Sequence, residues 1–221
     1  MSEQVMKQLR IDFVSDVMCP WCAIGLASLE QALLKLQGDV GVDLHFQPFE
    51  LNPQMPPEGE PVEAHLRLKY GMTQAQLDEN QARIAARGAE LGFTFDFNAR
   101  SRMWNSFDAH RLLHWAGLQG LELQRALKHA LLRAHFTEGR NVSDHAVLAE
   151  IAASVGLDAA QVQAVLMEGR YADDVREAEE FFRRNGITGV PAIIIEQKHL
   201  ISGGQPVDVF ERALREIAVA K

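Results

Sequence analysis

Residues 9–26 read LRIDFVSDVMCPWCAIGL, and this stretch decides the fold. Its first part alternates, with Leu9, Ile11 and Phe13 on one face, which predicts a β-strand that enters a short polar turn. From Trp21 onward, leucines recur at steps of three and four residues, which predicts an amphipathic helix. Two cysteines lie at the junction, so we expect the helix to begin at them.

Further strand patterns follow on both sides of a long middle region. Val42, Leu44 and Phe46 alternate again, and the order strand, helix, strand favours a parallel pair joined by a right-handed crossover. Strand patterns return only near the end, at residues 192–196 and 200–204, which are close enough to form a hairpin before a last amphipathic helix. The two ends of the chain therefore predict one α/β core with a mixed sheet and flanking helices.

The middle of the chain has a different pattern. Four prolines between residues 53 and 61 indicate an exposed connection, and residues 62–184 show helical periodicity broken by glycines, with scarcely any strand signal. Residues 143–146, Ser-Asp-His-Ala, and residues 158–161, Asp-Ala-Ala-Gln, each look like the cap of a helix, and in the second Gln161 follows Asp158 by three residues in the manner of a capping box. We therefore predict a core made of residues 1–61 and 185–221, split by a large all-α insertion of residues 62–184.

Composition narrows the class of protein. The 221 residues are 47% hydrophobic and 24% charged, with a formal net charge of −8, which disfavours binding to nucleic acid or to an anionic membrane surface. No apolar run approaches the roughly 18 residues of a membrane span, and the first ten residues show no secretory signal. The sequence therefore predicts a cytoplasmic protein.

The two cysteines are the only ones in the chain, too few for a disulfide scaffold, and they occur as Cys19-Pro20-Trp21-Cys22. A thiolate attacks a disulfide, whereas a thiol scarcely does. Unpaired N–H groups and the positive end of the dipole at a helix start favour the Cys19 anion, and Pro20 fits the first turn because no N–H donor is needed there. Cys22, nearly one turn later, can close a disulfide with Cys19. The pattern predicts Cys19 as the nucleophile and Cys22 as the resolving thiol.

Two other uses of the cysteine pair stay open at this point. The pair can be chemically inert, or it can be half of a zinc site. His110 and His114, one helical turn apart, would complete a Cys2His2 set, although the gap between the pairs is much longer than in a zinc finger. The position between a strand and a helix favours redox chemistry, so we expect no metal and no bound cofactor.

Several short motifs together resemble a known family, and they are Asp16–Cys22, Pro48–Leu51, Ala109–Leu112, Phe136–Gly139 and Gly189–Pro191. Over nearly its whole length the chain is similar to the FrnE-like branch of the DsbA-like thioredoxin superfamily, which is related to 2-hydroxychromene-2-carboxylate isomerases and kappa-class glutathione transferases. The resemblance implies a thioredoxin-like core and thiol-disulfide oxidoreductase or disulfide isomerase activity. It also implies that Pro191 is a cis proline facing the two cysteines.

Other residues are expected to bind the substrate. A cis proline would present the backbone of Val190 to an extended peptide, and such pairing suits an enzyme that accepts many cysteine-containing proteins or peptides. Pro20 and Trp21 lie between the cysteines, so Trp21 must cover the disulfide or face the substrate. The resemblance suggests that the helix carrying His110 overhangs the cysteines, where His110 would contact substrate or thiolate; a hydrogen-bonded packing role is the alternative.

We expect most of the acidic residues to lie at the surface. Asp12, Asp16 and Glu50 lie near predicted strand ends, where a buried acid could accept the proton that Cys22 releases, but solvent exposure is expected for at least two of them. The acidic run of residues 173–180 lies on a helix whose other face is apolar, which predicts a solvated face without a function.

Three classes of function follow. The first is a thiol-disulfide oxidoreductase or isomerase, with glutathione as a possible redox partner. The second is a glutathione-dependent isomerase or transferase, from which this chain departs because Cys19 stands where those enzymes are expected to use a serine. The third is a non-enzymatic binding module stapled by zinc.

Overall fold

A mixed four-stranded sheet forms the centre of the computed structural model, which describes residues 7–220. The sheet has the order β2-β1-β5-β6, with β1 (Lys7–Ser15), β2 (Val40–Pro48), β5 (Ala192–Ile195) and β6 (His199–Ser202). β1 and β2 are parallel, whereas β1 with β5 and β5 with β6 are antiparallel. The predicted parallel pair and the predicted hairpin are therefore confirmed.

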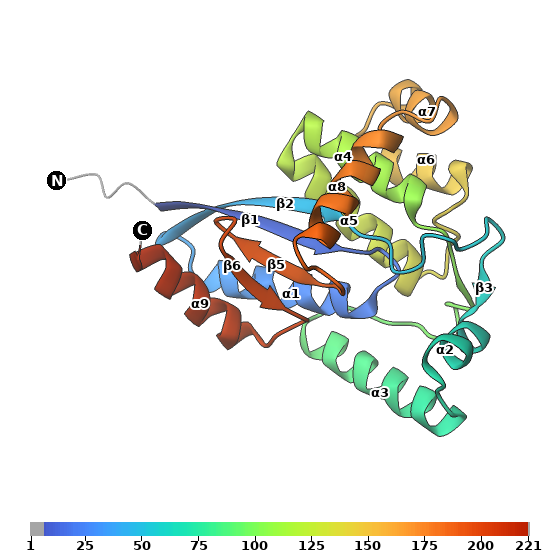
Figure 1. Ribbon diagram of the computed structural model, residues 1–221, viewed down its shortest axis with the longest axis horizontal. Coiled ribbons are helices and arrows are strands. Elements are labelled where there is room, and N and C mark those ends of the chain that lie inside the picture. Colours follow the sequence, from blue (N-terminus) through green and yellow to red (C-terminus); the bar gives the residue numbers. More distant parts are fainter. Residues whose placement is uncertain (1–6, 221) are drawn as a thin grey trace.

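The helices nearest the two ends of the chain cover one face of this sheet. α1 (Pro20–Lys35) and α9 (Val207–Ala220) lie against each other below the strands in Figure 1. The alternating side chains of β1 that open the sequence pattern, Leu9, Ile11 and Phe13, are fully buried and pack with these two helices in one apolar cluster. Burial of an apolar face of this kind stabilises the sheet and the helices together.

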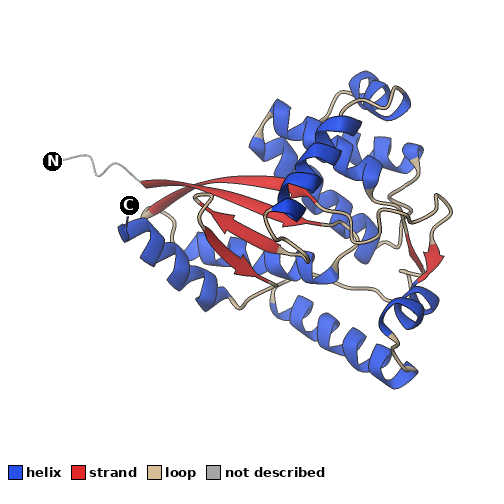
Figure 2. Ribbon diagram, in the orientation of Figure 1, coloured by secondary structure: helices blue, strands red, loops and turns tan. Residues whose placement is uncertain are grey.

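The middle of the chain is helical, as predicted. Its helices are α2 (Val62–Tyr70), α3 (Gln74–Glu90), α4 (Phe107–Gln119), α5 (Leu121–Phe136), α6 (His145–Ser154), α7 (Ala159–Met167) and α8 (Ala172–Arg184). Figure 2 shows these helices on the side of the molecule away from the two chain ends. One short antiparallel pair, β3 (Glu60–Pro61) with β4 (Arg102–Met103), was not predicted, because two-residue strands carry no detectable alternation.

The helical segment and the sheet share their apolar interior. Leu132 and Phe136 of α5 belong to the same buried cluster as the two cysteines. The side chain of Gln124 accepts a hydrogen bond from the Phe46 N–H and donates one to the Phe46 carbonyl, both at 3.0 Å. These bonds cover part of the free edge of β2, which would otherwise be open to pairing with another chain.

Helix caps in the insertion follow the sequence signals. Asp144 accepts hydrogen bonds from the N–H groups of Ala146 and Val147, and Asp158 accepts one from Gln161. Both predicted caps are therefore confirmed. A full capping box, with bonds in both directions, is found between Thr73 and Gln76 at the start of α3, whereas at Asp158 the bond from the Gln161 N–H is the one described.

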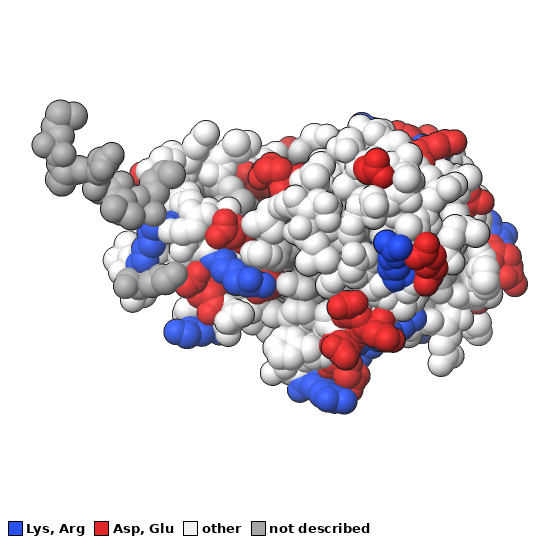
Figure 3. Space-filling model, turned by 90° about the horizontal axis from the view of Figure 1, so that it is seen from above, with Lys and Arg blue, Asp and Glu red and all other residues white. Residues whose placement is uncertain are grey.

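The surface carries charges of both signs. On the face seen in Figure 3, acidic and basic side chains are scattered between uncharged ones, and the basic side chains form no continuous area there. Within residues 7–220, no helix combines the length and the apolar character needed to cross a bilayer.

Candidate active site

The turn after β1 places Cys19 at the N-cap of α1, directly before the first helical residue. Cys19 is the N-cap of α1, with extended backbone (φ −92°, ψ 113°), and Pro20 is the first helical residue. The Cys22 N–H donates a hydrogen bond to the Cys19 carbonyl at 3.0 Å. Both cysteines are free thiols; Cys19 is 5% exposed and Cys22 is fully buried. The predicted start of the helix at the cysteine pair is therefore confirmed.

The two thiols have opposite pKa shifts. The pKa of Cys19 is lowered, first because the Cys22 thiol donates a hydrogen bond to its sulfur; burial opposes this shift, the N–H groups of Cys22 and Trp21 add to it, and the charge of Asp16 opposes it. Burial, followed by the neighbouring Cys19, raises the pKa of Cys22 well above its ordinary value. Cys19 therefore ionises first, and the partner thiol is the largest single cause of its lowered pKa.

A loop before β5 contacts Cys19. The Cys19 thiol donates to the Val190 carbonyl, with Sγ and O separated by 3.6 Å. The Val190–Pro191 peptide bond is cis, as the family resemblance implies. Pro191 packs on α1 at Gly25, where an added Cβ would lie only 3.0 Å from Pro191 Cγ. The glycine therefore lets the loop approach the helix closely.

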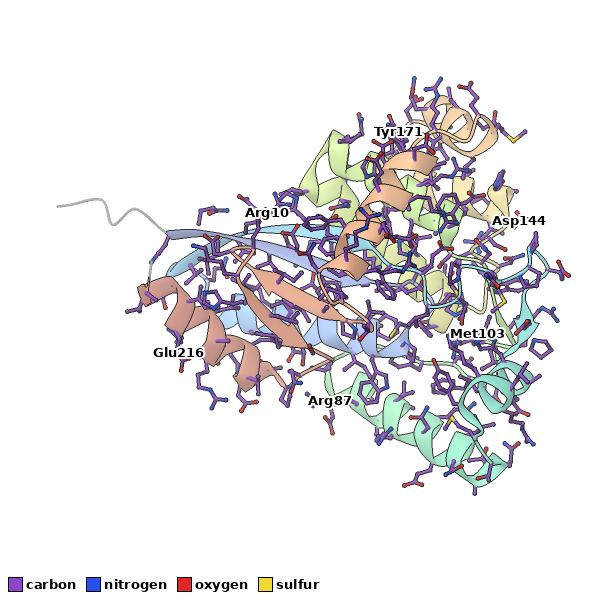
Figure 4. All side chains as sticks on the ribbon, in the orientation of Figure 1. Arg10, Arg87, Met103, Asp144, Tyr171 and Glu216 are labelled. Carbon is purple, nitrogen blue, oxygen red and sulfur yellow. The ribbon has the colours of Figure 1, made fainter. Side chains whose placement is uncertain are left out.

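Cys19 lines a cavity of about 390 Å³. Its lining includes Cys19, Pro20 and Trp21 of α1, Gly189 and Val190 of the cis-proline loop, and Tyr70, Ile84, Arg100 and Met103 of the insertion. In Figure 4, Met103 is labelled beside α2. A larger groove of about 550 Å³ lies along α8 and the β5–β6 hairpin and contains neither cysteine. We take the smaller cavity as the candidate site because Cys19 lines it.

Trp21 is placed where either predicted role is possible. The side chain is partly buried, packs against the apolar cluster that contains both cysteines, and lines the cavity. The guanidinium group of Arg83 on α3 lies 5.5 Å from the centre of its ring, at a distance typical of a cation–π contact. α3 therefore helps to fix the orientation of this wall.

His110 is not among the residues that line this cavity. Its side chain is buried, and its Nε2 lies 3.5 Å from Asp16 Oδ1. Asp16 in turn accepts hydrogen bonds from the N–H groups of Met18 at 3.1 Å and Leu51 at 2.8 Å. The structure thus brings His110 close to the turn that carries Cys19, but its buried Nε2 makes no hydrogen bond within residues 7–220.

The expectation that at least two of the nearby acids are solvated is wrong. Asp12, Asp16 and Glu50 are 5%, 1% and 2% exposed. Asp12 is held by Arg10 at 2.7 Å and lines the larger groove, away from the thiols, whereas Asp16 directly supports the active-site turn. Single carboxylates at strand ends carry no periodic signal, so the sequence could not separate them.

The acidic run on α8 is also not uniformly solvated, which corrects the prediction for residues 173–180. Glu179 is fully buried and accepts a hydrogen bond from the Glu50 N–H at 2.8 Å. Arg176 pairs with Glu179 at 2.9 Å and also with the Glu50 carboxylate. A signal was available here, because Glu179 follows the buried Val175 by four residues and therefore shares its helix face.

The two histidines considered for zinc have different neighbours, since His110 lies near Asp16. His114 packs on Tyr171, with ring centroids 5.4 Å apart, and Figure 4 labels Tyr171 close to α7. Within the described part of the chain, no three His, Cys, Asp or Glu side chains are arranged to hold a metal ion.

Two buried cations near the site were not foreseen from the sequence. Lys128 of α5 is fully buried, its Nζ has no hydrogen-bond partner within residues 7–220, and it lies 5.9 Å from the centre of the Phe46 ring. Burial lowers the pKa of Lys128, while the charges of Cys22, Asp16 and Cys19 raise it. Arg100 is 7% exposed and lines the cavity. Both residues lie far from the cysteines in sequence, so no local pattern identifies them.

Comparison with known proteins gives one family over most of the chain. The profile of the DSBA-like thioredoxin domain matches residues 10–215. The chain is 28% identical to the uncharacterized protein YwbO of Bacillus subtilis over 209 residues, covering 94% of this chain and 96% of that protein.

Solved structures agree with this result. A probable DsbA oxidoreductase from Streptomyces coelicolor is 36% identical and superposes with a TM-score of 0.88, covering 96% of this chain and 91% of that one. The cytosolic disulfide reductase DsbM of Pseudomonas aeruginosa, solved with GSH, is 22% identical with a TM-score of 0.64, covering 96% of this chain and all of that one (100%). The second comparison concerns the fold alone.

Proposed function

Because the chain belongs to the family of DSBA-like thioredoxin domains, we propose that it is a thiol-disulfide oxidoreductase or disulfide isomerase that acts through Cys19 and Cys22. The observation that carries this proposal is the pair of free thiols at the start of α1, one with a lowered and one with a raised pKa. A thiolate that faces a cavity can capture a substrate, and a buried thiol beside it can release that substrate.

The reaction is a pair of exchanges at sulfur. The Cys19 thiolate attacks one sulfur of a substrate disulfide, forms a mixed disulfide, and expels the other sulfur as a thiolate that takes up a proton. Cys22 then loses its proton and attacks Cys19 Sγ, which breaks the mixed disulfide and releases the second substrate thiol. The substrate gains two electrons and the Cys19–Cys22 pair loses two. The reverse sequence oxidises a dithiol, and return of the mixed disulfide to another substrate sulfur gives isomerisation.

The cis-proline loop supplies a surface for the substrate backbone. Thr188, Gly189 and Val190 line the cavity beside Cys19. The Val190 N–H has no hydrogen-bond partner among the described residues. An extended segment of a cysteine-containing protein or peptide can therefore pair with Val190 and present its sulfur to Cys19. Trp21 and Pro20 form the adjoining wall.

Glutathione is the low-molecular-weight thiol that we include in the proposal as a redox partner, since the fold relative DsbM is solved with GSH. We place the activity in the cytoplasm, which is also where that relative is described. A glutathione-dependent isomerase is the competing function, and the buried Cys22 argues against it because such an enzyme needs no resolving thiol. We propose that His110 supports Asp16 and the turn before Cys19, and that it does not contact the substrate.

Substitution of each cysteine separates the candidates. Cys19→Ser should abolish reduction of insulin disulfides and of small disulfides, and full activity in this variant would exclude the proposal. Cys22→Ser should still form a mixed disulfide but should fail to release it, which mass spectrometry of the intact protein detects. Unimpaired turnover of Cys22→Ser with glutathione would favour the isomerase. One zinc per chain, lost on substitution of Cys19 or His110, would favour the zinc-stapled binding module.

A further inference from the structure

The guanidinium group of Arg100 is buried beside the reactive cysteine without an acidic partner. Its Nε donates to His135 Nε2 at 3.0 Å, its Nη2 contacts Met103 Sδ at 2.8 Å, and it lies 4.9 Å from the centre of the Phe136 ring. The pKa of His135 is lowered well below its ordinary value by burial and then by Arg100 itself, so this histidine is neutral. All the groups that hold Arg100 are therefore uncharged.

A buried cation with only neutral partners is unusual, because an isolated charge is costly to remove from water. Burial lowers the pKa of Arg100 to about 10, so the group still carries its charge at neutral pH. The group that opposes this shift is Cys19, whose negative charge favours the protonated guanidinium. In the reduced protein, the thiolate of Cys19 is thus the anion that acts on Arg100.

This balance changes when Cys19 reacts. Formation of the mixed disulfide converts the thiolate into a neutral sulfur, and Arg100 then loses the negative charge that acted on it. No Asp or Glu lines the cavity of about 390 Å³, although acidic residues outnumber basic ones by 30 to 22 in the chain. Among the described residues, Arg100 Nη1 is the guanidinium nitrogen without a hydrogen-bond partner, and it is not fully buried. Nη1 is therefore accessible.

We propose that Arg100 is a specificity-determining residue that binds a carboxylate of the substrate next to the sulfur under attack. The inference rests on the proposed function and names its substrate class, which is small disulfides whose thiol halves carry a carboxylate. A cavity of this volume is in the range of small-molecule sites. A planar guanidinium is suited to this role because its fork matches the two oxygens of a carboxylate.

The decisive experiment compares three small disulfides of similar size that differ in charge. These are 3,3′-dithiodipropionate, bis(2-hydroxyethyl) disulfide and cystamine, each mixed with the reduced protein in single-turnover reactions, so that no recycling partner is needed. The wild-type protein should react fastest with the dicarboxylate and slowest with the diamine. A charge-assisted hydrogen bond predicts a preference of about tenfold or more over the neutral disulfide.

Variants assign this preference to Arg100. Arg100→Met keeps a side chain of comparable length, and it should remove the preference while the neutral disulfide still reacts. Arg87→Met makes the same change of charge on α3, where Arg87 pairs with Glu90 and does not line the cavity, and should keep the preference. The ratio of two rates is the readout, because any change in the thiolate population of Cys19 affects both reactions equally.

A second measurement stays informative if Arg100→Met does not fold. Iodoacetate and iodoacetamide both alkylate the Cys19 thiolate with loss of iodide and differ in the carboxylate. The wild-type protein should show a higher ratio of iodoacetate to iodoacetamide rate constants than free glutathione does, and Arg100→Lys should lower that ratio.

Equal reaction with all three disulfides, together with an alkylation ratio no higher than that of glutathione, would overturn carboxylate recognition. Loss of all reaction in Cys19→Ser would show that the thiol chemistry itself still stands. Slow reaction of small disulfides together with fast reaction of a peptide disulfide flanked by glutamate would overturn the small-molecule source of the carboxylate.

Discussion

Asp16→Asn should lower the stability of the protein and at the same time make Cys19 a stronger acid. Asp16 is 1% exposed, and its two carboxylate oxygens accept hydrogen bonds from the N–H groups of Met18 at 3.1 Å and Leu51 at 2.8 Å. An asparagine has nearly the same shape but only one acceptor oxygen, so it can satisfy only one of these donors. The other N–H would face an amide NH2 group in the protein interior.

The size of the stability loss follows from that lost bond. A hydrogen bond to a charged group contributes about 1.5–3 kcal/mol, so the free energy of unfolding should fall by about this amount. In a chain of this length, each kcal/mol corresponds to about 2–4 °C in melting temperature, which gives a decrease of roughly 3–12 °C.

The pH dependence of this effect has a definite sign. Burial opposes the charge of Asp16, but the neighbouring His110 and the two N–H donors outweigh it and lower the pKa below the ordinary value of 3.8. A lowered pKa in the folded state stabilises the protein above 3.8, and this stabilisation is lost as the pH falls through the folded-state value. The difference between wild type and Asp16→Asn should therefore be constant near neutral pH and should shrink below 3.8.

The effect on the thiol is opposite because the negative charge of Asp16 raises the pKa of Cys19. Its removal should increase the rate of alkylation by iodoacetamide at a pH below the wild-type pKa. The matched control is Asp12→Asn, which removes a buried carboxylate from β1, four residues before Asp16, but lies away from the thiols. A variant Asp16→Asn with unchanged stability, or with slower alkylation of Cys19, would refute the reasoning.

Three further substitutions test other parts of the site. Cys22→Ala should raise the pKa of Cys19, because it removes the thiol that contributes most to lowering it, and should slow alkylation at neutral pH by about tenfold. Lys128→Met should increase the free energy of unfolding in urea at pH 7 by about 1–3 kcal/mol, since it replaces a buried amine without a partner by an apolar chain; a decrease would show that the amine is stabilising. Glu179→Ala should lower the free energy of unfolding by about 1–3 kcal/mol because it leaves the buried N–H of Glu50 without an acceptor, whereas the exposed neighbour Glu180→Ala should change stability by less than about 0.5 kcal/mol.

The sequence predicted those parts of the site that depend on local structure. The alternation of β1 and the proline at the first helical position are properties of a few neighbouring residues, and both are confirmed by the backbone. Glu179 shows where such reasoning is incomplete. Its spacing from the buried Val175 indicates the buried face of α8, but the prediction of a solvated face followed its charge alone.

The electrostatics of the site depend on contacts that local patterns do not contain. Arg100 lies between α3 and β4, about 80 residues from the cysteines along the chain. Lys128 lies within α5, about 110 residues from them. An arginine in a loop and a lysine in an amphipathic helix are ordinary surface features in a sequence. Only the packing of the insertion on the sheet shows that both are buried.

The charged groups around Cys19 come from two parts of the chain, and this explains why the insertion affects the pKa of Cys19. The N-terminal segment supplies the Cys19 thiolate and Asp16, two negative charges close together, and Asp16 on its own makes the thiolate less stable. The insertion supplies the buried cations Arg100 and Lys128, and Cys19 acts on both of them. Because electrostatic interactions are reciprocal, both cations must also favour the thiolate. A change that loosens the packing of α5 against the sheet should therefore raise the pKa of Cys19, even though it alters no residue of the cysteine motif.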